Sequence, residues 1–124
     1  MRYIAFIKHT KDYRGIKPPA ALMEAMGKFV GENLETGKFV DGAGLQSTHR
    51  AKKVQLRNGE VRVVDGPFAE SKEIVGGYTI MEVESDAEAL ELAKQFVELH
   101  RLYAPGIEIE CELRAVQTGE PGSE

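Results

Sequence analysis

The sequence predicts a single α+β domain in which two helices alternate with β-strands. Apolar residues recur at helical spacing in residues 18–37 and 85–106, and short β-prone runs flank each stretch. In addition, Asn58-Gly59 separates two alternating runs, which is a strong signal for a β-hairpin. The chain has 124 residues, 42% of them hydrophobic, which is enough to bury one core. We therefore expect one domain over residues 1–117 and a disordered tail over residues 118–124.

The first two expected elements are a buried strand and an amphipathic helix. Residues 3–7 form a short, continuous apolar run that ends at Lys8, a pattern typical of a central strand. Pro18-Pro19 can open the helix that follows. The apolar face of this helix carries Leu22, Met23, Met26, Val30 and Leu34. Gly37 is expected to end the helix in a left-handed conformation.

The middle of the chain is expected to be β-structure. Residues 38–45 predict a second strand, in which Gly42 and Gly44 indicate a bulge or a close approach by another group. Residues 53–64 form the hairpin, and residues 74–83 form the third main strand.

A second helix and a last strand complete the pattern. Ser85 and Glu88 form a capping box at the start of the helix, and Pro105-Gly106 closes it. The last strand alternates acidic residues with the apolar residues Ile107, Ile109, Cys111 and Leu113.

This order of elements is a ferredoxin-like split βαβ arrangement with an inserted β-hairpin. Right-handed crossovers place the first and third main strands at the centre of the sheet and the last strand at an edge. Two helices cover only one face of such a sheet, yet the first strand carries apolar residues on both faces. We therefore expect a homodimer that packs sheet face against sheet face with two-fold symmetry.

Composition excludes several classes of function. The formal net charge is −4 and the sequence has no basic stripe, so nucleic acid is not an expected partner. No apolar run approaches the roughly 20 residues of a membrane span. The single cysteine and the absence of a signal-peptide pattern favour a cytoplasmic location. No His-x-x-x-His or Cys-x-x-Cys spacing is present, so we expect neither a metal nor another cofactor.

The segment from Asp65 to Tyr78 carries most of the candidate chemistry. Pro67 fixes one backbone dihedral after the Asp65-Gly66 turn, so the Asp65 carboxylate is held in place, and Phe68 can act as an apolar plug. The charges of Glu70, Lys72 and Glu73 can shift a carboxylate pKa. One interpretation makes Asp65 a turn cap beside a solvated loop, and the other makes it a carboxylate facing a cleft between subunits. In the second, backbone approaches the ligand at Gly42, Gly44, Gly76 and Gly77.

The three histidines differ in their expected roles. His9 follows the first strand and His49 precedes the hairpin, so both are candidates for the cleft, with a surface loop position as the alternative. His100 is expected to be a helix-flank residue near the C-terminal end of the helix dipole. Cys111 is expected to be a core thiol.

Residues 65–73, followed by Gly77-Tyr78, resemble the signature of the DGPF proteins in the YCII-related superfamily. The resemblance implies a ferredoxin-like dimeric α/β barrel and small bacterial proteins often encoded near extracytoplasmic sigma factors, with no settled activity. It also implies a precedent for acid–base chemistry, such as dehydrohalogenation, by a His and Asp pair without a metal or organic cofactor. The histidines of this sequence do not align with that role.

Two kinds of function follow as hypotheses. The first is a cofactor-free enzyme that acts on a small organic molecule in a cleft of the dimer, with a carboxylate and a histidine as acid and base. The candidate catalytic residues are Asp65, Glu70, His9 and His49. The candidate ligand-binding residues are Gly42, Gly44, Arg50, Phe68, Lys72, Gly77 and Tyr78. The alternative is a non-catalytic ligand-sensing or structural dimer module linked to transcriptional regulation by a sigma factor.

Overall fold

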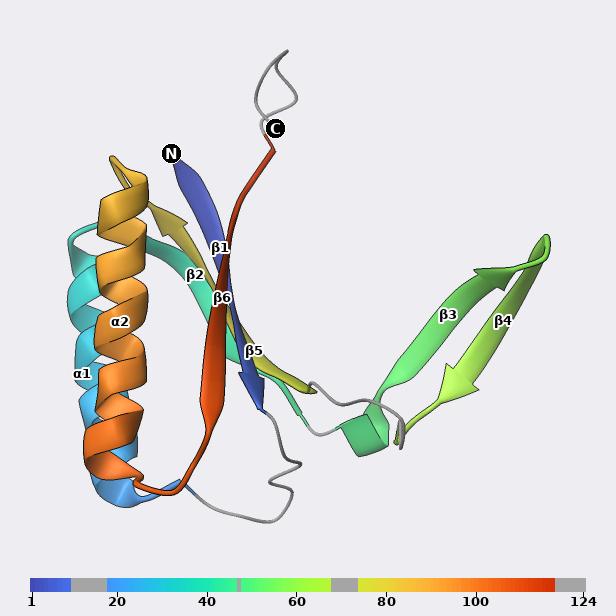
Figure 1. Ribbon diagram of the computed structural model, residues 1–124, viewed down its shortest axis with the longest axis horizontal. Helices are drawn as coiled ribbons and strands as arrows, with labels where there is room; N and C mark the ends of the chain where they lie inside the picture. The colour runs from blue at the N-terminus through green and yellow to red at the C-terminus, as the bar shows by residue number, and fades with distance from the viewer. Residues whose placement is uncertain (10–17, 47, 68–73, 118–124) are drawn as a thin grey trace.

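The structure is a computed structural model that describes residues 1–9, 18–46, 48–67 and 74–117. It shows an antiparallel four-stranded sheet, two helices packed side by side on one face of that sheet, and a separate two-stranded hairpin (Figure 1). The expected tail, residues 118–124, lies outside the described residues. This α+β architecture is compatible with a ferredoxin-like fold.

The main sheet has the strand order β2-β5-β1-β6, and every neighbouring pair is antiparallel. Its strands are β1 (Arg2–His9), β2 (Phe39–Gly44), β5 (Ile74–Glu82) and β6 (Ile109–Ala115). The first and third main strands, β1 and β5, are therefore central, and the last strand, β6, is at an edge. Both placements agree with the prediction from right-handed crossovers.

The core lies between the helices and one face of the sheet. Tyr3 and Ala5 of β1 are buried on this face, and Tyr3 pairs with the buried Met81 of β5. They pack in one cluster with Ala89 and Leu92 of the second helix. Because side chains alternate along a strand, the neighbours of Tyr3 and Ala5 point to the opposite face, where Figure 1 shows no helix.

Helix α1 (Ala20–Glu35) begins after Pro19 and ends before Gly37, which has a φ of +81° and donates its backbone N–H to the Leu34 carbonyl. Its apolar face is only partly buried. Leu22 is 2% exposed, whereas Met23 is 53% exposed and Leu34 is 49% exposed. The exposed part of this face borders a hollow rather than the sheet, as described below.

Helix α2 (Asp86–Tyr103) begins at the predicted cap, where the Ser85 hydroxyl accepts the backbone N–H of Glu88 at 3.1 Å. After the helix, Gly106 adopts a φ of +95°. Neither helix of the described chain combines the length and the apolar character that crossing a membrane requires.

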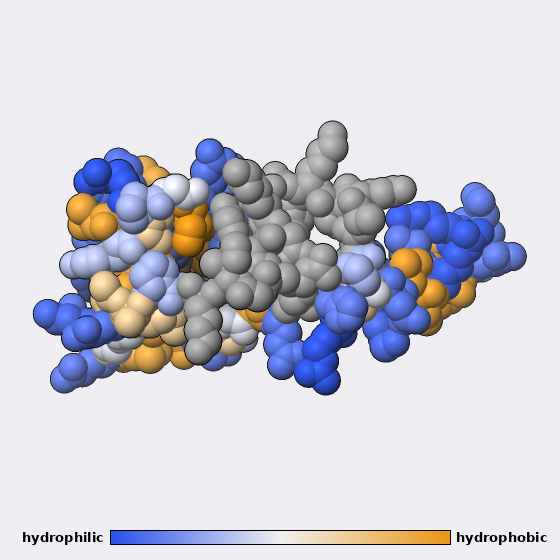
Figure 2. Space-filling view, turned by 90° about the horizontal axis from the view of Figure 1, so that it is seen from below, coloured by the Kyte–Doolittle hydropathy of each residue, from blue (hydrophilic) through white to orange (hydrophobic). Residues whose placement is uncertain are grey.

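The hairpin consists of β3 (Lys52–Arg57) and β4 (Glu60–Asp65), which follow a short 3-10 helix, Thr48–Arg50. Asn58 and Gly59 both have positive φ values, 53° and 79°, as a tight hairpin turn requires. The hairpin projects away from the main sheet and its helices (Figure 1). In Figure 2, hydrophobic surface lies among strongly hydrophilic surface at this end of the molecule.

Candidate functional site

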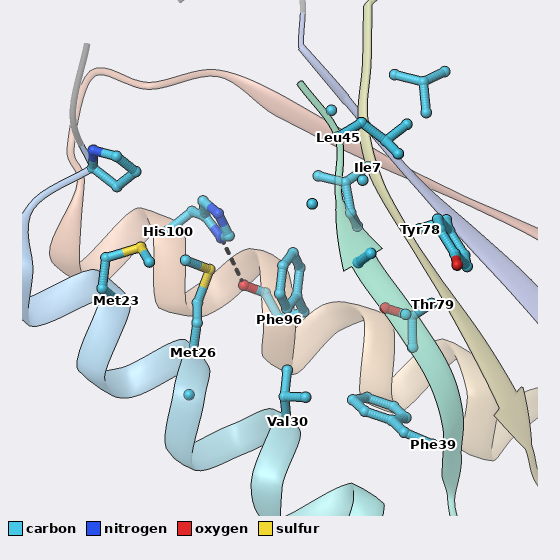
Figure 3. Close-up of a pocket in the computed structure, with 18 of the residues that line it drawn as sticks. Ile7, Met23, Met26, Val30, Phe39, Leu45, Tyr78, Thr79, Phe96 and His100 are labelled. Carbon is cyan, nitrogen blue, oxygen red and sulfur yellow. Dashed lines mark hydrogen bonds between the residues drawn. The ribbon is translucent and has the colours of Figure 1, made fainter. Parts of the chain in front are cut away.

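A pocket of about 870 Å³ lies between the helices and the side of the sheet formed by β2 and β5. Figure 3 shows side chains of both helices facing the strands across it. Most of the lining is apolar: α1 supplies Met23, Met26 and Val30, α2 supplies Phe96, and β2 supplies Phe39. The half-exposed Met23 and Leu34 of α1 are explained by this hollow, because both belong to its wall.

His9 and His100 place two imidazoles in the lining of this mostly apolar pocket. His9 is the last residue of β1, on the face that carries Ala5 and Ile7, and His100 lies in the last turns of α2. Each belongs to a regular element, so its position is set by the packing of the helices on the sheet. This pairing gives the pocket two polar groups that can accept or donate protons.

A bulge in β5 makes room for the ring of His9. Ile7 pairs with Gly77 and Lys8 pairs with Val75, so Gly76 is an extra residue without a partner in the β1 ladder. A Cβ atom on Gly76 would lie only 2.4 Å from Nε2 of His9. The absence of a side chain at residue 76 therefore allows the imidazole to lie directly against the backbone of β5.

The surroundings of His9 favour its neutral imidazole. Burial lowers the pKa of His9 below its ordinary value, and the positive charge that His100 can carry lowers this pKa further. A neutral imidazole near pH 7 has an unprotonated ring nitrogen that can accept a proton from a bound molecule.

His100 is held in one orientation within α2. It is 7% exposed, and its Nδ1 lies 3.0 Å from the backbone carbonyl oxygen of Phe96, which can only accept a hydrogen bond. In the neutral ring Nδ1 therefore carries the proton and Nε2 is the acceptor. The rings of His100 and Phe96 also pack together, with centroids 4.8 Å apart.

The sequence alone predicts a helix-flank position for His100, whereas the structure buries it in the pocket lining, so it was not among the predicted site residues. The signal was nevertheless present, because residues 89, 93, 96 and 100 are spaced by three or four and share one face of a helix. Ala89 and Ala93 on this face are buried, and the face also lines the pocket through Phe96.

Four of the predicted ligand-binding residues, Gly42, Gly44, Gly77 and Tyr78, belong to the β2–β5 wall of the pocket, where alternation along β5 points the Tyr78 side chain to the opposite face of the sheet. Two of these glycines serve close packing of the chain on itself. A Cβ atom on Gly42 would lie 2.8 Å from the Tyr78 carbonyl oxygen, and one on Gly77 would lie 3.1 Å from the Ala43 carbonyl oxygen. Gly44 has open space around its Cα, with nothing within 4 Å of an added Cβ.

Asp41 is the one carboxylate among the described residues of the lining. Its Oδ1 accepts the backbone N–H of Gly42 at 2.8 Å, and its Oδ2 lies 3.5 Å from the Tyr78 hydroxyl. One oxygen of this carboxylate therefore holds the backbone of β2.

The structure does not bring Asp65 to the pocket. Asp65 ends β4, is exposed, and pairs with Lys52 across the base of the hairpin, with 2.5 Å between Oδ1 and Nζ. The next residue, Gly66, donates its N–H to the Ala51 carbonyl at 2.8 Å, and a Cβ atom on Gly66 would lie 1.8 Å from the Thr48 carbonyl oxygen. Among the described residues, this part of the segment fastens the base of the hairpin.

The remaining candidates divide into two groups. His49 and Arg50 lie in the short 3-10 helix, are exposed, and do not line the pocket. Phe68, Glu70 and Lys72 lie outside the described residues.

Two further observations concern possible metal ligands and the cysteine. Within the described ranges, no three His, Cys, Asp or Glu side chains gather closely enough to hold a metal ion. Cys111 packs against the core from β6, and burial raises the pKa of its thiol.

The fold and the site together define a small α+β domain with an apolar pocket under its helices and two histidines in the pocket lining. The family model of the YCII-related domain matches residues 1–101, and the chain belongs to this family. The match runs from β1 into the end of α2 and includes both histidines of the pocket. The chain is also 39% identical over 61 residues to an uncharacterized protein of Rhizobium meliloti (strain 1021). That alignment spans 49% of this chain and 49% of the relative, about half the length of each.

Proposed function

We propose that the pocket binds a small organic molecule with an apolar body and one polar group, which hydrogen-bonds to His9 and His100. The observation that carries this proposal is the pairing of two imidazoles in a lining that is otherwise mostly apolar. A volume of about 870 Å³ is within the range of small-molecule sites. The two methionines of α1 in the wall can adjust to ligands of different shape, because methionine is flexible and polarizable.

The catalytic form of the proposal is cofactor-free acid–base chemistry with His9 as the base. The lowered pKa of His9 favours the neutral ring, which can take a proton from an acidic C–H or O–H group of the ligand. The electron pair of the broken bond then stays on the ligand, and the proton resides on His9 until it returns to the product. Proton return closes the cycle, so no external oxidant or reductant is needed.

A non-catalytic ligand sensor is the second candidate. It is favoured by the position of Asp65, which is ion-paired at the base of the hairpin and lies outside the pocket. Asp41, in the β2 wall of the pocket, accepts the N–H of Gly42 and has the Tyr78 hydroxyl as its side-chain neighbour. A sensor needs affinity and selectivity from the pocket but no carboxylate partner for its histidines.

A binding screen separates these proposals from a pocket without function. The screen applies small carboxylates, phenols and aldehydes to the wild type and to His9→Gln, with thermal shift followed by calorimetry. Asp65→Asn is the matched control, because it alters a candidate residue outside the pocket. We expect compounds that bind the wild type and Asp65→Asn equally but bind His9→Gln at least about tenfold more weakly, as the loss of one hydrogen bond to the ligand predicts. Equal binding to all three proteins would refute the proposed site. Turnover of a bound compound by the wild type and Asp65→Asn, but not by His9→Gln, would support the enzyme over the sensor.

We also propose a homodimer through the open face of the sheet, as in a dimeric α/β barrel. Ile4 and Phe6 of β1 pair with Ile80 and Tyr78 of β5, so four large side chains share the face opposite the helices. Each of the four is partly exposed in the single chain. A second copy of the same face would bury them with closed symmetry. A monomer at micromolar concentration in sedimentation equilibrium would refute this dimer.

A further inference from the structure

The β3–β4 hairpin has one aliphatic face that no element of the described chain covers. Val54 pairs with Val63 and Leu56 pairs with Val61, so these four side chains point to the same side of the two-stranded ribbon. They are between 64% and 72% exposed. The opposite side carries the pairs Lys53 with Val64 and Gln55 with Arg62, so the hairpin is amphipathic.

An isolated two-stranded hairpin with such a face is marginally stable in water. It gains stability when its apolar side packs on another surface, and exposed aliphatic clusters of this kind commonly mark interaction sites. In Figure 1 the hairpin extends away from the helices and the main sheet of its own chain. The surface that covers it is therefore expected to come from another molecule.

Charge indicates what that molecule is. The hairpin, residues 52–65, holds four basic and two acidic residues, so its charge is +2. The whole chain has a charge of −4, which leaves −6 on the rest of the molecule. The body of a second copy is thus opposite in charge to the hairpin.

The open face of the main sheet offers the matching surface. Ile4 and Phe6 form its apolar centre, and around it the same face carries charges of both signs: Lys8 of β1, ion-paired with Glu112 at 2.7 Å, and Glu110 and Arg114 of β6. An apolar centre with a charged rim complements the aliphatic face of a hairpin whose Lys52 and Asp65 pair with each other at its base.

We propose that each hairpin is an arm that packs its aliphatic face against a second copy of this chain, at the β6 side of that copy's open sheet face. The inference rests on the proposed homodimer and adds to it a specific set of contacts. Two-fold symmetry makes the exchange reciprocal, so both arms are covered at once.

The test replaces Val54 and Val63 with threonine in one variant. Threonine keeps the branched shape and the strand preference of valine but adds a hydroxyl, so the hairpin itself retains its local preference. Val64→Thr is the matched control, because it makes the same change on the opposite side of the same hairpin. Sedimentation equilibrium gives the dimer dissociation constant of each protein.

We expect the double variant to dimerise at least about tenfold more weakly than the wild type, and the control to stay within about twofold. Hydrogen exchange supplies a second measurement: amides of β3 and β4 should exchange more slowly at concentrations where the wild type is dimeric. If the wild type is a dimer and the double variant dimerises equally well with unprotected hairpin amides, the arm exchange is refuted and the sheet-face dimer stands. If the wild type is a monomer, both the dimer and the arm exchange fail.

Discussion

Replacing Gly76 with alanine places a methyl group where the ring of His9 now lies. An added Cβ would be 2.4 Å from Nε2 and 2.5 Å from Cδ2 of His9. Nonbonded carbon atoms settle about 3.5 Å apart, so the imidazole must move by about 1 Å or adopt another rotamer. Overpacking of this kind costs about 1–3 kcal/mol of the free energy of unfolding.

Gly44→Ala is the matched control for this change. Gly44 also lines the pocket, and a Cβ there would meet no atom within 4 Å. Its substitution is therefore expected to be neutral, or to stabilise by up to about 1 kcal/mol through the reduced entropy of the unfolded chain. Urea unfolding followed by circular dichroism measures both variants against the wild type.

A double-mutant cycle tests the cause of the effect. In a His9→Ala background the ring is absent, so Gly76→Ala should cost no more than Gly44→Ala. The pocket is expected to lose affinity for its ligands in Gly76→Ala. If Gly76→Ala destabilises equally with and without the His9 ring, or leaves the wild-type stability unchanged, the proposed contact between ring and bulge is refuted.

Three further predictions concern pH, the hairpin base and the thiol. The pKa of His9 is lower in the folded than in the unfolded chain, so the unfolded chain takes up the proton first as the pH falls below about 6.5. We therefore expect the free energy of unfolding to decrease as the pH falls from there to the folded-state pKa. Urea titrations at several pH values should show that His9→Gln flattens this dependence. Gly66→Ala should destabilise the base of the hairpin by more than about 1 kcal/mol, because its Cβ would lie 1.8 Å from the Thr48 carbonyl oxygen. Hydrogen exchange in β3 and β4 at the wild-type rate would contradict this prediction. Cys111 should react slowly with a thiol reagent at pH 7 and much faster in denaturant, because burial raises its pKa; equal rates in both conditions would show that the thiol is accessible in the folded protein.

The fold followed from the sequence wherever local chemistry and the global pattern agree. The Ser85 cap, the turn at Asn58-Gly59 and the stop at Gly37 each depend on residues within one turn of the chain, and each is present. The strand order also followed, because crossover handedness restricts the choices.

The site could be predicted less well from the sequence. Periodicity shows which face of a helix or strand is apolar, but not where two apolar faces stand apart and leave a pocket between them. Met23 fits the apolar stripe of α1, yet it borders a pocket instead of the core. Gly76 was noted as a glycine for close approach, but no sequence rule indicates that the approaching group is His9 of the same chain. The strong motif at Asp65 drew attention to the hairpin base, while His100 carries no motif of its own and enters the site only through the packing of α2 on the sheet.

His9 and His100 line the pocket from the same chain, and this has a consequence for mixed assemblies. A single cleft on the two-fold axis that needs the same residue of both chains loses function in every dimer with one defective chain, so activity falls faster than the fraction of wild-type chains. A pocket contained in each chain loses binding in simple proportion to the defective fraction, whatever the assembly. Mixing wild-type and Gly76→Ala chains should therefore give a straight line for the number of sites against composition.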